Sequence, residues 1–272
     1  PSPPFYVGLS ILVYPIATTL AFPIVASLSD SYETTYRQER RTRELFSRYV
    51  SAELVERLLA QAEPVSLSGE RRLVTVLFSD IRGFSKMSQE MTPDDVVRTL
   101  NEYFTLMVDI VFRFGGTVDK FMGDGLMVLF GAPLGMPDQA YVAASTAQAM
   151  QRAVDDFNAH PSRAGRVALH IGIGIDSGET VTGNVGSPKR MEYTAIGTAV
   201  NNAYFLSKVT GPGESLMTPA TKRMLDGRIA EELGPRIALR GSDEQTQLYR
   251  IPTSGSSIPE KASEDGKLEP AV

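Results

Sequence analysis

The pattern of apolar and polar positions predicts a strand, a helix and a hairpin, in that order. Residues 73–80 form an apolar run that reads as a strand, and residues 116–130 form a second apolar stretch. A glycine-rich turn at residues 123–125 divides the second stretch into two hairpin strands. Between the two stretches, apolar residues recur at helical spacing over 96–111, after a capping signature that begins at Thr92.

Two of these predicted elements end on an aspartate that is followed at once by glycine-rich backbone. Asp80 ends the first strand, and Asp124 lies in the hairpin turn. A right-handed crossover makes the first two strands parallel, so Asp80 and the Asp124 turn are expected at the same edge of the sheet. Paired carboxylates of this kind suit a hard divalent cation such as Mg²⁺. The alternative is that each aspartate only stabilises its own turn.

The rest of the chain predicts a second helix and further strands. A helix over 138–159 has an alanine-rich face, which indicates close packing on a sheet. A strand over 167–175 is expected to turn at 176–178 and return over 180–185, which completes a strand-helix-strand-strand-helix-strand order. That order is the ferredoxin-like α+β arrangement, βαββαβ. Additional elements are predicted after it: a helix from Thr198, a strand at 215–217, a short helix after Pro219, and strands near 236–240 and 247–251.

Four motifs, in order, resemble the catalytic domain of class III nucleotidyl cyclases. They are FSDIRGF at 78–84, DKFMGDG at 119–125, GNVGS at 183–187 and YTAIGTAVN at 193–201. The resemblance covers about residues 70–251 and implies a catalytic domain that cyclises a nucleoside triphosphate.

The resemblance also implies a two-metal site and a phosphate site. Asp80, Asp124 and the carbonyl group of Ile81 would hold two divalent cations, Mg²⁺ or Mn²⁺. The backbone at Phe84 and Ser85 would meet the phosphates, a task that suits exposed N–H groups beside glycine.

The remaining substrate contacts implied by the resemblance point to ATP. Lys120, which alternates with Val118 along its strand, matches the base-reading lysine of adenylate cyclases, and Thr194 matches the second base-reading position. Asn201 matches the residue that orients the ribose, and Arg240 stands where a lysine usually binds the terminal phosphates. In the family one subunit supplies the metal aspartates and the other supplies these groups, so a homodimer with shared active sites is expected.

One position departs from the family pattern. The family places an arginine four residues after the asparagine, where this chain has Phe205. Losing one preorganised donor costs about a hundredfold or more in turnover. Either another cation such as Lys208 substitutes, or the protein is slow, or altered, or needs a second chain as partner.

The N-terminal segment predicts a membrane tether. Residues 5–28 are apolar and uncharged, and a bilayer span needs about 20 such residues. Arginines from residue 37 onward follow it, which places the catalytic domain in the cytoplasm and the protein in the cell membrane. The alternative is a buried soluble helix. We expect a transmembrane helix over 1–29, the end of a longer membrane or sensor region, and a disordered tail over 252–272.

Residues 30–69 are expected to form juxtamembrane helices and a linker. These helices would either pair in a dimer and pass a signal onward or act as a spacer that packs on its own domain, because the heptad pattern is too short to decide.

Composition narrows the possible functions. The net charge is −5 and mixed in sign, which gives no indication of a nucleic-acid surface. The chain has no cysteine, so disulfides and thiolate metal sites are excluded, and its two histidines cannot form a histidine-rich site. His170 is predicted to be a packed strand residue.

The function predicted from the sequence is a membrane-tethered adenylate cyclase that converts ATP to cyclic AMP and pyrophosphate. The alternative is a degenerate cyclase domain that binds nucleotide and dimerises as a regulatory module, which Phe205 favours. A diguanylate cyclase is disfavoured because its acidic Gly-Gly-Asp/Glu-Glu-Phe turn is missing.

Overall fold

The computed structural model describes residues 69–253, except 164–165, 188–189 and 242. The predicted transmembrane helix over 1–29 lies outside the described residues, as do the juxtamembrane segment over 30–69 and the tail over 252–272 apart from their boundary residues. In the part of the chain that is described, no helix combines the length and the apolar character needed to cross a bilayer.

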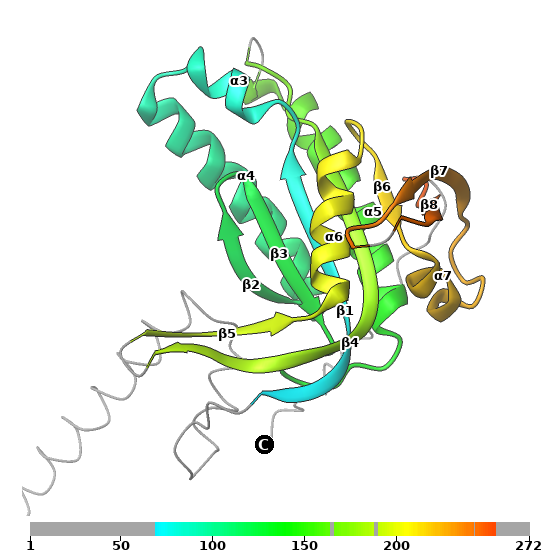
Figure 1. Cartoon of the computed structure of the whole chain (residues 1–272). Helices are drawn as coiled ribbons and strands as arrows, with labels where there is room; N and C mark the ends of the chain where they lie inside the picture. Colours follow the sequence, from blue (N-terminus) through cyan, green and yellow to red (C-terminus); the bar gives the residue numbers. More distant parts are fainter. Residues whose placement is uncertain (1–68, 164–165, 188–189, 242, 254–272) are drawn as a thin grey trace, which may run out of the picture. The chain divides into compact units, whose positions relative to one another are not determined.

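One mixed sheet organises the described residues (Figure 1). The strand order is β2-β3-β1-β4-β6-β8-β7, and β5 pairs with β4 outside this path. The strands are β1 (Glu70–Ile81), β2 (Thr117–Met122), β3 (Gly125–Phe130), β4 (Ile171–Ser187), β5 (Arg190–Ile196), β6 (Ser215–Met217), β7 (Glu232–Ala238) and β8 (Gln245–Arg250).

The predicted ferredoxin-like order is present in the first half of the sheet. β1, helix α4 (Pro93–Arg113), β2, β3, helix α5 (Gln139–Ala159) and β4 follow one another along the chain. Both β1 and β2 pair antiparallel with β3, so β1 and β2 run parallel with β3 between them. This arrangement confirms the α+β prediction and places the ends of β1 and β2 at the same edge.

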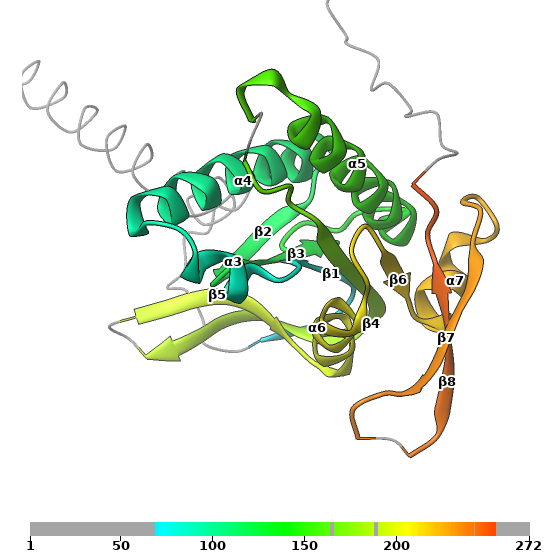
Figure 2. The ribbon, with the colours of Figure 1, turned by 90° about the horizontal axis from the view of Figure 1, so that it is seen from above.

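Helices α4 and α5 cover one face of the sheet, and α6 (Thr198–Val209) covers the other (Figure 2). Thr92 caps α4 as predicted, because its side chain accepts a hydrogen bond from the N–H of Asp95. The predicted alanine face of α5 is buried: Ala140, Ala143, Ala144 and Ala147 lie in the core with Leu77 and Ile81 of β1. On the opposite face, Ala199 and Ala203 of α6 pack with Val74, Val76 and Phe78 of β1.

Two glycines of β4 allow α6 to approach the sheet closely. A Cβ atom on Gly174 would lie 2.3 Å from the carbonyl oxygen of Ala203 and from the backbone nitrogen of Ser207. A Cβ atom on Gly172 would lie 2.2 Å from the hydroxyl oxygen of Thr210. The close backbone approach predicted from these glycines is therefore confirmed.

The C-terminal additions extend the sheet beyond β4. β6 pairs parallel with β4, helix α7 (Pro219–Leu225) follows it, and the β7–β8 hairpin joins β6 through β8. The predicted final strands therefore exist, although the first begins four residues earlier than expected, at Glu232.

The predicted turn at residues 176–178 is wrong. β4 continues through Asp176, Ser177 and Gly178 as one strand of 17 residues, and these residues pair with Val76, Thr75 and Val74 of β1. The chain returns later, through β5. The small polar residues at 176–178 do not turn the chain because each of them pairs with β1. His170 is also misplaced by the sequence prediction, since it is exposed and precedes β4.

A bulge in β2 changes which way its side chains face. The pairing register with β3 shifts between Val118 and Lys120, so Asp119 is an extra residue in the strand. Val118 packs with the core beneath α4 and α5, and Phe121 contacts Phe104 of α4. Lys120 instead faces β5, where it pairs with Glu192. The regular alternation expected for Lys120 and Val118 is therefore wrong.

Candidate active site

Asp80 and Asp124 meet at one edge of the sheet. Asp80 lies opposite Gly125 in the β1–β3 ladder, and Gly125 directly follows Asp124. Asp80 is only 7% exposed, whereas Asp124 is half-buried in the turn between β2 and β3. The right-handed crossover through α4 produces this juxtaposition, because β1 and β2 finish at the same edge.

The electrostatics of this pair favour a bound cation. Burial raises the pKa of Asp124, and the nearby charge of Asp80 raises that pKa further. Two carboxylates that repel each other at a partly buried edge are stabilised by positive charge between them. Ile81 follows Asp80, and its side chain is buried in the core, so only its backbone carbonyl is available as a ligand. The oxygen donors present therefore fit a hard divalent metal.

No group of three or more acidic or histidine side chains gathers anywhere in the described residues. This does not conflict with a magnesium-type site, because Mg²⁺ is commonly bound by one or two carboxylates together with substrate phosphates and water.

Two cationic side chains pair with Asp80. The ammonium group of Lys208 lies 2.5 Å from Oδ1 of Asp80, and the guanidinium group of Arg82 pairs with Oδ2. Arg82 also donates to the backbone carbonyls of Lys208 at 3.3 Å and Thr210 at 3.4 Å. Arg82 thus ties the end of β1 to the C-terminal end of α6, where a cation is favoured by the helix dipole.

The predicted phosphate-binding backbone lies just after this pair of strand ends. Phe84 and Ser85 begin the short helix α3 (Phe84–Gln89), which the sequence analysis did not predict. Gly83 precedes them with a φ of 70°, a left-handed conformation that glycine adopts without strain. Phe84 packs partly against the core, whereas Ser85 is exposed.

The predicted base-reading residues lie on β2 and β5. The ammonium group of Lys120 lies 2.9 Å from a carboxylate oxygen of Glu192 and 3.4 Å from Oδ1 of Asp119. Thr194 is only 8% exposed, and its hydroxyl lowers the pKa of Asp119. Lys120 and Thr194 are therefore neighbours of one buried acid.

The other predicted residues lie apart from these groups. Asn201 is exposed on α6, and Arg240 is exposed beyond the end of β7. Within the described part of the chain, the side chains of Asn201 and Arg240 reach neither Asp80 nor Asp124 by a hydrogen bond or an ion pair. Phe205 is half-buried and packs on the small core formed by Leu206, Leu216 and Leu248.

Two residues of this region were not singled out from the sequence: Asp119 and Arg82. Each is adjacent to a predicted site residue within the quoted motifs. An acid beside a lysine in an otherwise apolar strand was a usable signal for Asp119. The bulge that turns both side chains toward β5 has no such signal.

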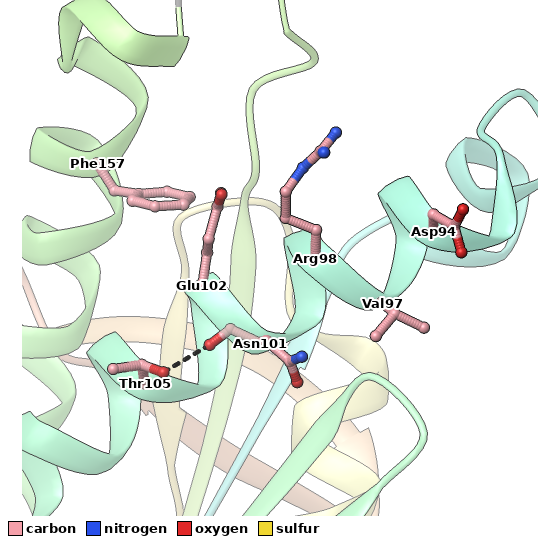
Figure 3. Close-up of a pocket in the computed structure, with 7 residues that line it drawn as sticks. All are labelled: Asp94, Val97, Arg98, Asn101, Glu102, Thr105 and Phe157. Carbon is pink, nitrogen blue, oxygen red and sulfur yellow. Dashed lines mark hydrogen bonds between the residues drawn. The ribbon is translucent and has the colours of Figure 1, made fainter.

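A separate hollow lies on α4 (Figure 3). It has a volume of about 720 Å³ and includes Phe157 of α5. The Thr105 hydroxyl donates to the carbonyl of Asn101 at 2.7 Å within it. None of the predicted site residues lines this hollow.

Curated relatives come from mycobacteria. An uncharacterised protein of Mycobacterium tuberculosis is 37% identical over 226 residues, which is 79% of this chain and 38% of that protein. A second uncharacterised protein of the same species is 35% identical over 219 residues, which is 78% of this chain and 36% of that protein. The chain thus spans less than two fifths of the length of these relatives.

Solved structures show the same fold. The adenylyl cyclase CyaB from P. aeruginosa is 34% identical with a TM-score of 0.67, over 71% of this chain and 100% of that chain. The guanylyl cyclase Cya2 is 35% identical with a TM-score of 0.65, over 72% of this chain and 98% of that chain. The model of the adenylate and guanylate cyclase catalytic domain matches residues 68–252. This match covers most of the sequence, and the chain belongs to the family of adenylate and guanylate cyclase catalytic domains.

Proposed function

We propose that this chain is an adenylate cyclase that converts ATP to 3′,5′-cyclic AMP and pyrophosphate. The observation that carries the proposal is the meeting of Asp80 and Asp124 at one sheet edge, in a chain of the cyclase family. The reaction is an intramolecular phosphoryl transfer in which the ribose 3′-hydroxyl attacks the α-phosphorus and pyrophosphate leaves.

The chain's own groups each take one part of this reaction. Asp80, Asp124 and the Ile81 carbonyl would hold two divalent cations, Mg²⁺ or Mn²⁺, which when bound lower the pKa of the hydroxyl and neutralise the phosphates. The backbone N–H groups at Phe84 and Ser85 would donate to the phosphate oxygens.

A partner subunit would complete the site. Asn201 would orient the ribose, and Arg240 would bind the terminal phosphates. The separation of these two side chains from Asp80 and Asp124 within one chain supports their action across a homodimer interface.

The preference for ATP rests on Lys120 and Thr194. The two similar solved structures are an adenylyl and a guanylyl cyclase at nearly equal identity, so likeness alone does not choose the base. An ammonium group can donate to N1 of adenine, and a threonine hydroxyl can accept from the N6 amino group. The neighbouring positions of Lys120 and Thr194 around Asp119 support reading of adenine at this place.

We extend the proposal to the site of action in the cell. The apolar segment over 5–28 would tether the protein to the cell membrane, with the catalytic domain over 70–251 in the cytoplasm and the segment over 30–69 between them. The length and flanking arginines of the segment support this part of the proposal.

The test is an assay of the purified chain with ATP and Mn²⁺, followed by chromatography of the nucleotide product. Cyclic AMP is expected, and GTP in place of ATP should give much less cyclic product. Asp80→Ala should abolish the signal, whereas Asp109→Ala, a change to a carboxylate on α4 outside the site, should retain it. A chain that forms no cyclic nucleotide would contradict the proposed activity.

Shared active sites can be tested by mixing two inactive variants. Asp80→Ala and Asn201→Ala should each be inactive alone, because each lacks one half of both sites. In a mixed dimer one site is intact and the other lacks both groups, so an equimolar mixture should recover about a quarter of the wild-type activity. No recovery in a mixture that forms mixed dimers would mean that each chain builds its own site.

A second candidate is a nucleotide-binding dimer without turnover. Phe205 favours it, because a phenylalanine stands where the family places the charge-stabilising arginine. The same assay separates the two candidates: such a dimer would bind ATP with Mn²⁺ and release no cyclic product.

A further inference from the structure

The carboxylate of Asp119 is buried without a fitting partner. Its side chain has no exposed surface. Among the described residues, neither of its oxygens completes a hydrogen bond of normal geometry. Unpartnered charges of this kind are costly and are retained mainly where they have a role.

The polar groups around Asp119 are all donors. The ammonium group of Lys120 lies 3.4 Å from Oδ1, and the Thr194 hydroxyl and the Ala195 N–H also face the carboxylate. Burial raises the pKa of Asp119, while the interactions with Thr194, Lys120 and Ala195 offset part of that rise.

The bulge in β2 is what creates this arrangement. In a regular strand Asp119 and Lys120 would face opposite sides of the sheet. The register shift between Val118 and Lys120 lets both side chains face β5, where Glu192 and Thr194 lie. The conformation of β2 therefore brings a buried acid to the two residues that the proposed function assigns to the base.

We propose that Asp119 is a specificity-determining positioning residue that fixes the Thr194 hydroxyl as a hydrogen-bond acceptor toward the substrate base. A carboxylate can only accept, so the hydroxyl proton of Thr194 points to Asp119 and its lone pairs point outward. An outward lone pair accepts from an exocyclic amino group, as on adenine, and repels a carbonyl oxygen, as on guanine. Asp119 also attracts the ammonium group of Lys120 and limits its positions.

This inference rests on the proposed base-reading role of Lys120 and Thr194, but its test does not require turnover. The full chain is titrated calorimetrically, with Mn²⁺, against 3′-deoxy-ATP and 3′-deoxy-GTP, which lack the attacking hydroxyl and cannot be cyclised. The measured quantity is the ratio of the two dissociation constants. Asp119→Asn keeps the shape of the side chain, and its amide can donate to Thr194, so the hydroxyl is free to donate to guanine.

The expected result is a shift of that ratio toward the GTP analogue by about tenfold, the scale of one misdirected buried hydrogen bond. In a Thr194→Ala background, Asp119→Asn should change the ratio little further, because the hydroxyl that it orients is gone. Asp176→Asn is the matched control: it is another buried aspartate of raised pKa, away from the base residues, and the ratio should not change.

Several results would overturn the inference. One is an equal loss of affinity for both analogues in Asp119→Asn, which indicates a structural role alone. Another is the same shift in the Thr194→Ala background. If Asp119→Asn does not fold by circular dichroism, Thr194→Val asks the question from the hydroxyl side, and an unchanged ratio there contradicts the inference.

The outcome is separable from that of the proposed activity. Absence of cyclic AMP with a shifted binding ratio would defeat the cyclase proposal and support the role of Asp119. Cyclic AMP production with an unshifted ratio would do the reverse. A wild-type chain that binds neither analogue would overturn the reading of a base at this site altogether.

Discussion

The ammonium group of Lys208 lies 2.5 Å from a carboxylate oxygen of Asp80, and the guanidinium group of Arg82 pairs with the other oxygen. The two cations differ in what holds them. Arg82 is also bonded to backbone carbonyls at the end of α6, whereas the side chain of Lys208 is 43% exposed. Lys208 is thus the more mobile of the two counter-ions and the one that a divalent cation at Asp80 would displace.

Lys208→Gln should therefore tighten metal binding. Without its ammonium group a divalent cation no longer competes for Asp80, and Mn²⁺ affinity should rise by about twofold to tenfold, the equivalent of a partly exposed ion pair. In EDTA the variant should be less stable by about 1 kcal/mol or less, because Asp80 and Asp124 repel each other with less compensation. Thermal unfolding in EDTA and across a Mn²⁺ titration measures both effects.

Lys222→Gln provides the control for that experiment. Lys222 pairs with Glu231 at 2.9 Å and is 37% exposed, so it matches Lys208 in pairing and exposure but lies on α7. Its loss should leave the Mn²⁺ dependence of unfolding unchanged. Weaker Mn²⁺ binding in Lys208→Gln would show instead that Lys208 helps to assemble the site.

Phe205→Arg should raise cyclase turnover. The family places an arginine at this helical position, and one preorganised donor to the reacting phosphate contributes about a hundredfold. Phe205 is half-buried against Leu206, Leu216 and Leu248, so the change should also cost about 1–2 kcal/mol of stability. The kcat for cyclic AMP formation and a denaturant titration measure the two effects.

Phe205→Met separates charge from packing. Methionine keeps an apolar side chain against the same cluster and donates no hydrogen bond, so it should not raise kcat. If Phe205→Arg folds and also shows no gain, the charge is supplied by another group or is not needed in this chain.

The motif order and the strand ends were predictable because they follow from local rules. An apolar run that ends at Asp80, a helix capped by Thr92 and a glycine turn at Asp124 each leave a signature in the sequence. The handedness of crossover connections then determines that the two aspartates share an edge. No tertiary information was needed for that step.

The continuation of β4 and the bulge in β2 were not predictable, because tertiary pairing decides both. Residues 176–178 look like a turn, yet each pairs with a residue of β1 and Asp176 accepts hydrogen bonds from other elements. The Asp119–Lys120 dipeptide looks like ordinary alternation, yet a register shift turns both side chains to β5. Propensity is a weak guide where pairing partners determine the backbone.

Asp176 should make stability depend on pH in a direction opposite to that of most paired acids. Burial raises its pKa, although Thr218, Asn202 and the N–H of Ser177 donate to it. A carboxyl whose pKa is higher in the folded state binds more protons there, so its contribution to stability falls as the pH rises through the folded pKa. Relative to Asp176→Asn, the wild-type chain should therefore gain stability as the pH is lowered from 7 toward about 4.

The two substitutions of Asp176 should differ in cost at neutral pH. Asn202 Oδ1 is a buried atom without a hydrogen-bond partner among the described residues, so it can accept from the new amide of Asp176→Asn. That variant should lie within about 1 kcal/mol of wild type, whereas Asp176→Ala, which leaves donors unpaired, should cost about 2–4 kcal/mol. Urea unfolding between pH 4 and 8 tests both statements. A flat difference between wild type and Asp176→Asn would show that Asp176 does not titrate in this range.

Ile196→Glu should separate the proposed homodimer. Val181 and Ile196 are cross-strand partners on the β4–β5 hairpin and are 40% and 55% exposed, an apolar pair that a second subunit can cover (Figure 1). A symmetric interface would bring the new charge in twice, so the dimer dissociation constant should rise at least about tenfold. Leu233→Glu, on β7 and 72% exposed, is the matched change away from this hairpin and should leave assembly unaffected. Sedimentation and cyclase activity measured at the same protein concentrations should fall together in Ile196→Glu, because neither half-site is complete alone. A monomeric Ile196→Glu chain that retains full activity would mean that the site does not need a partner subunit.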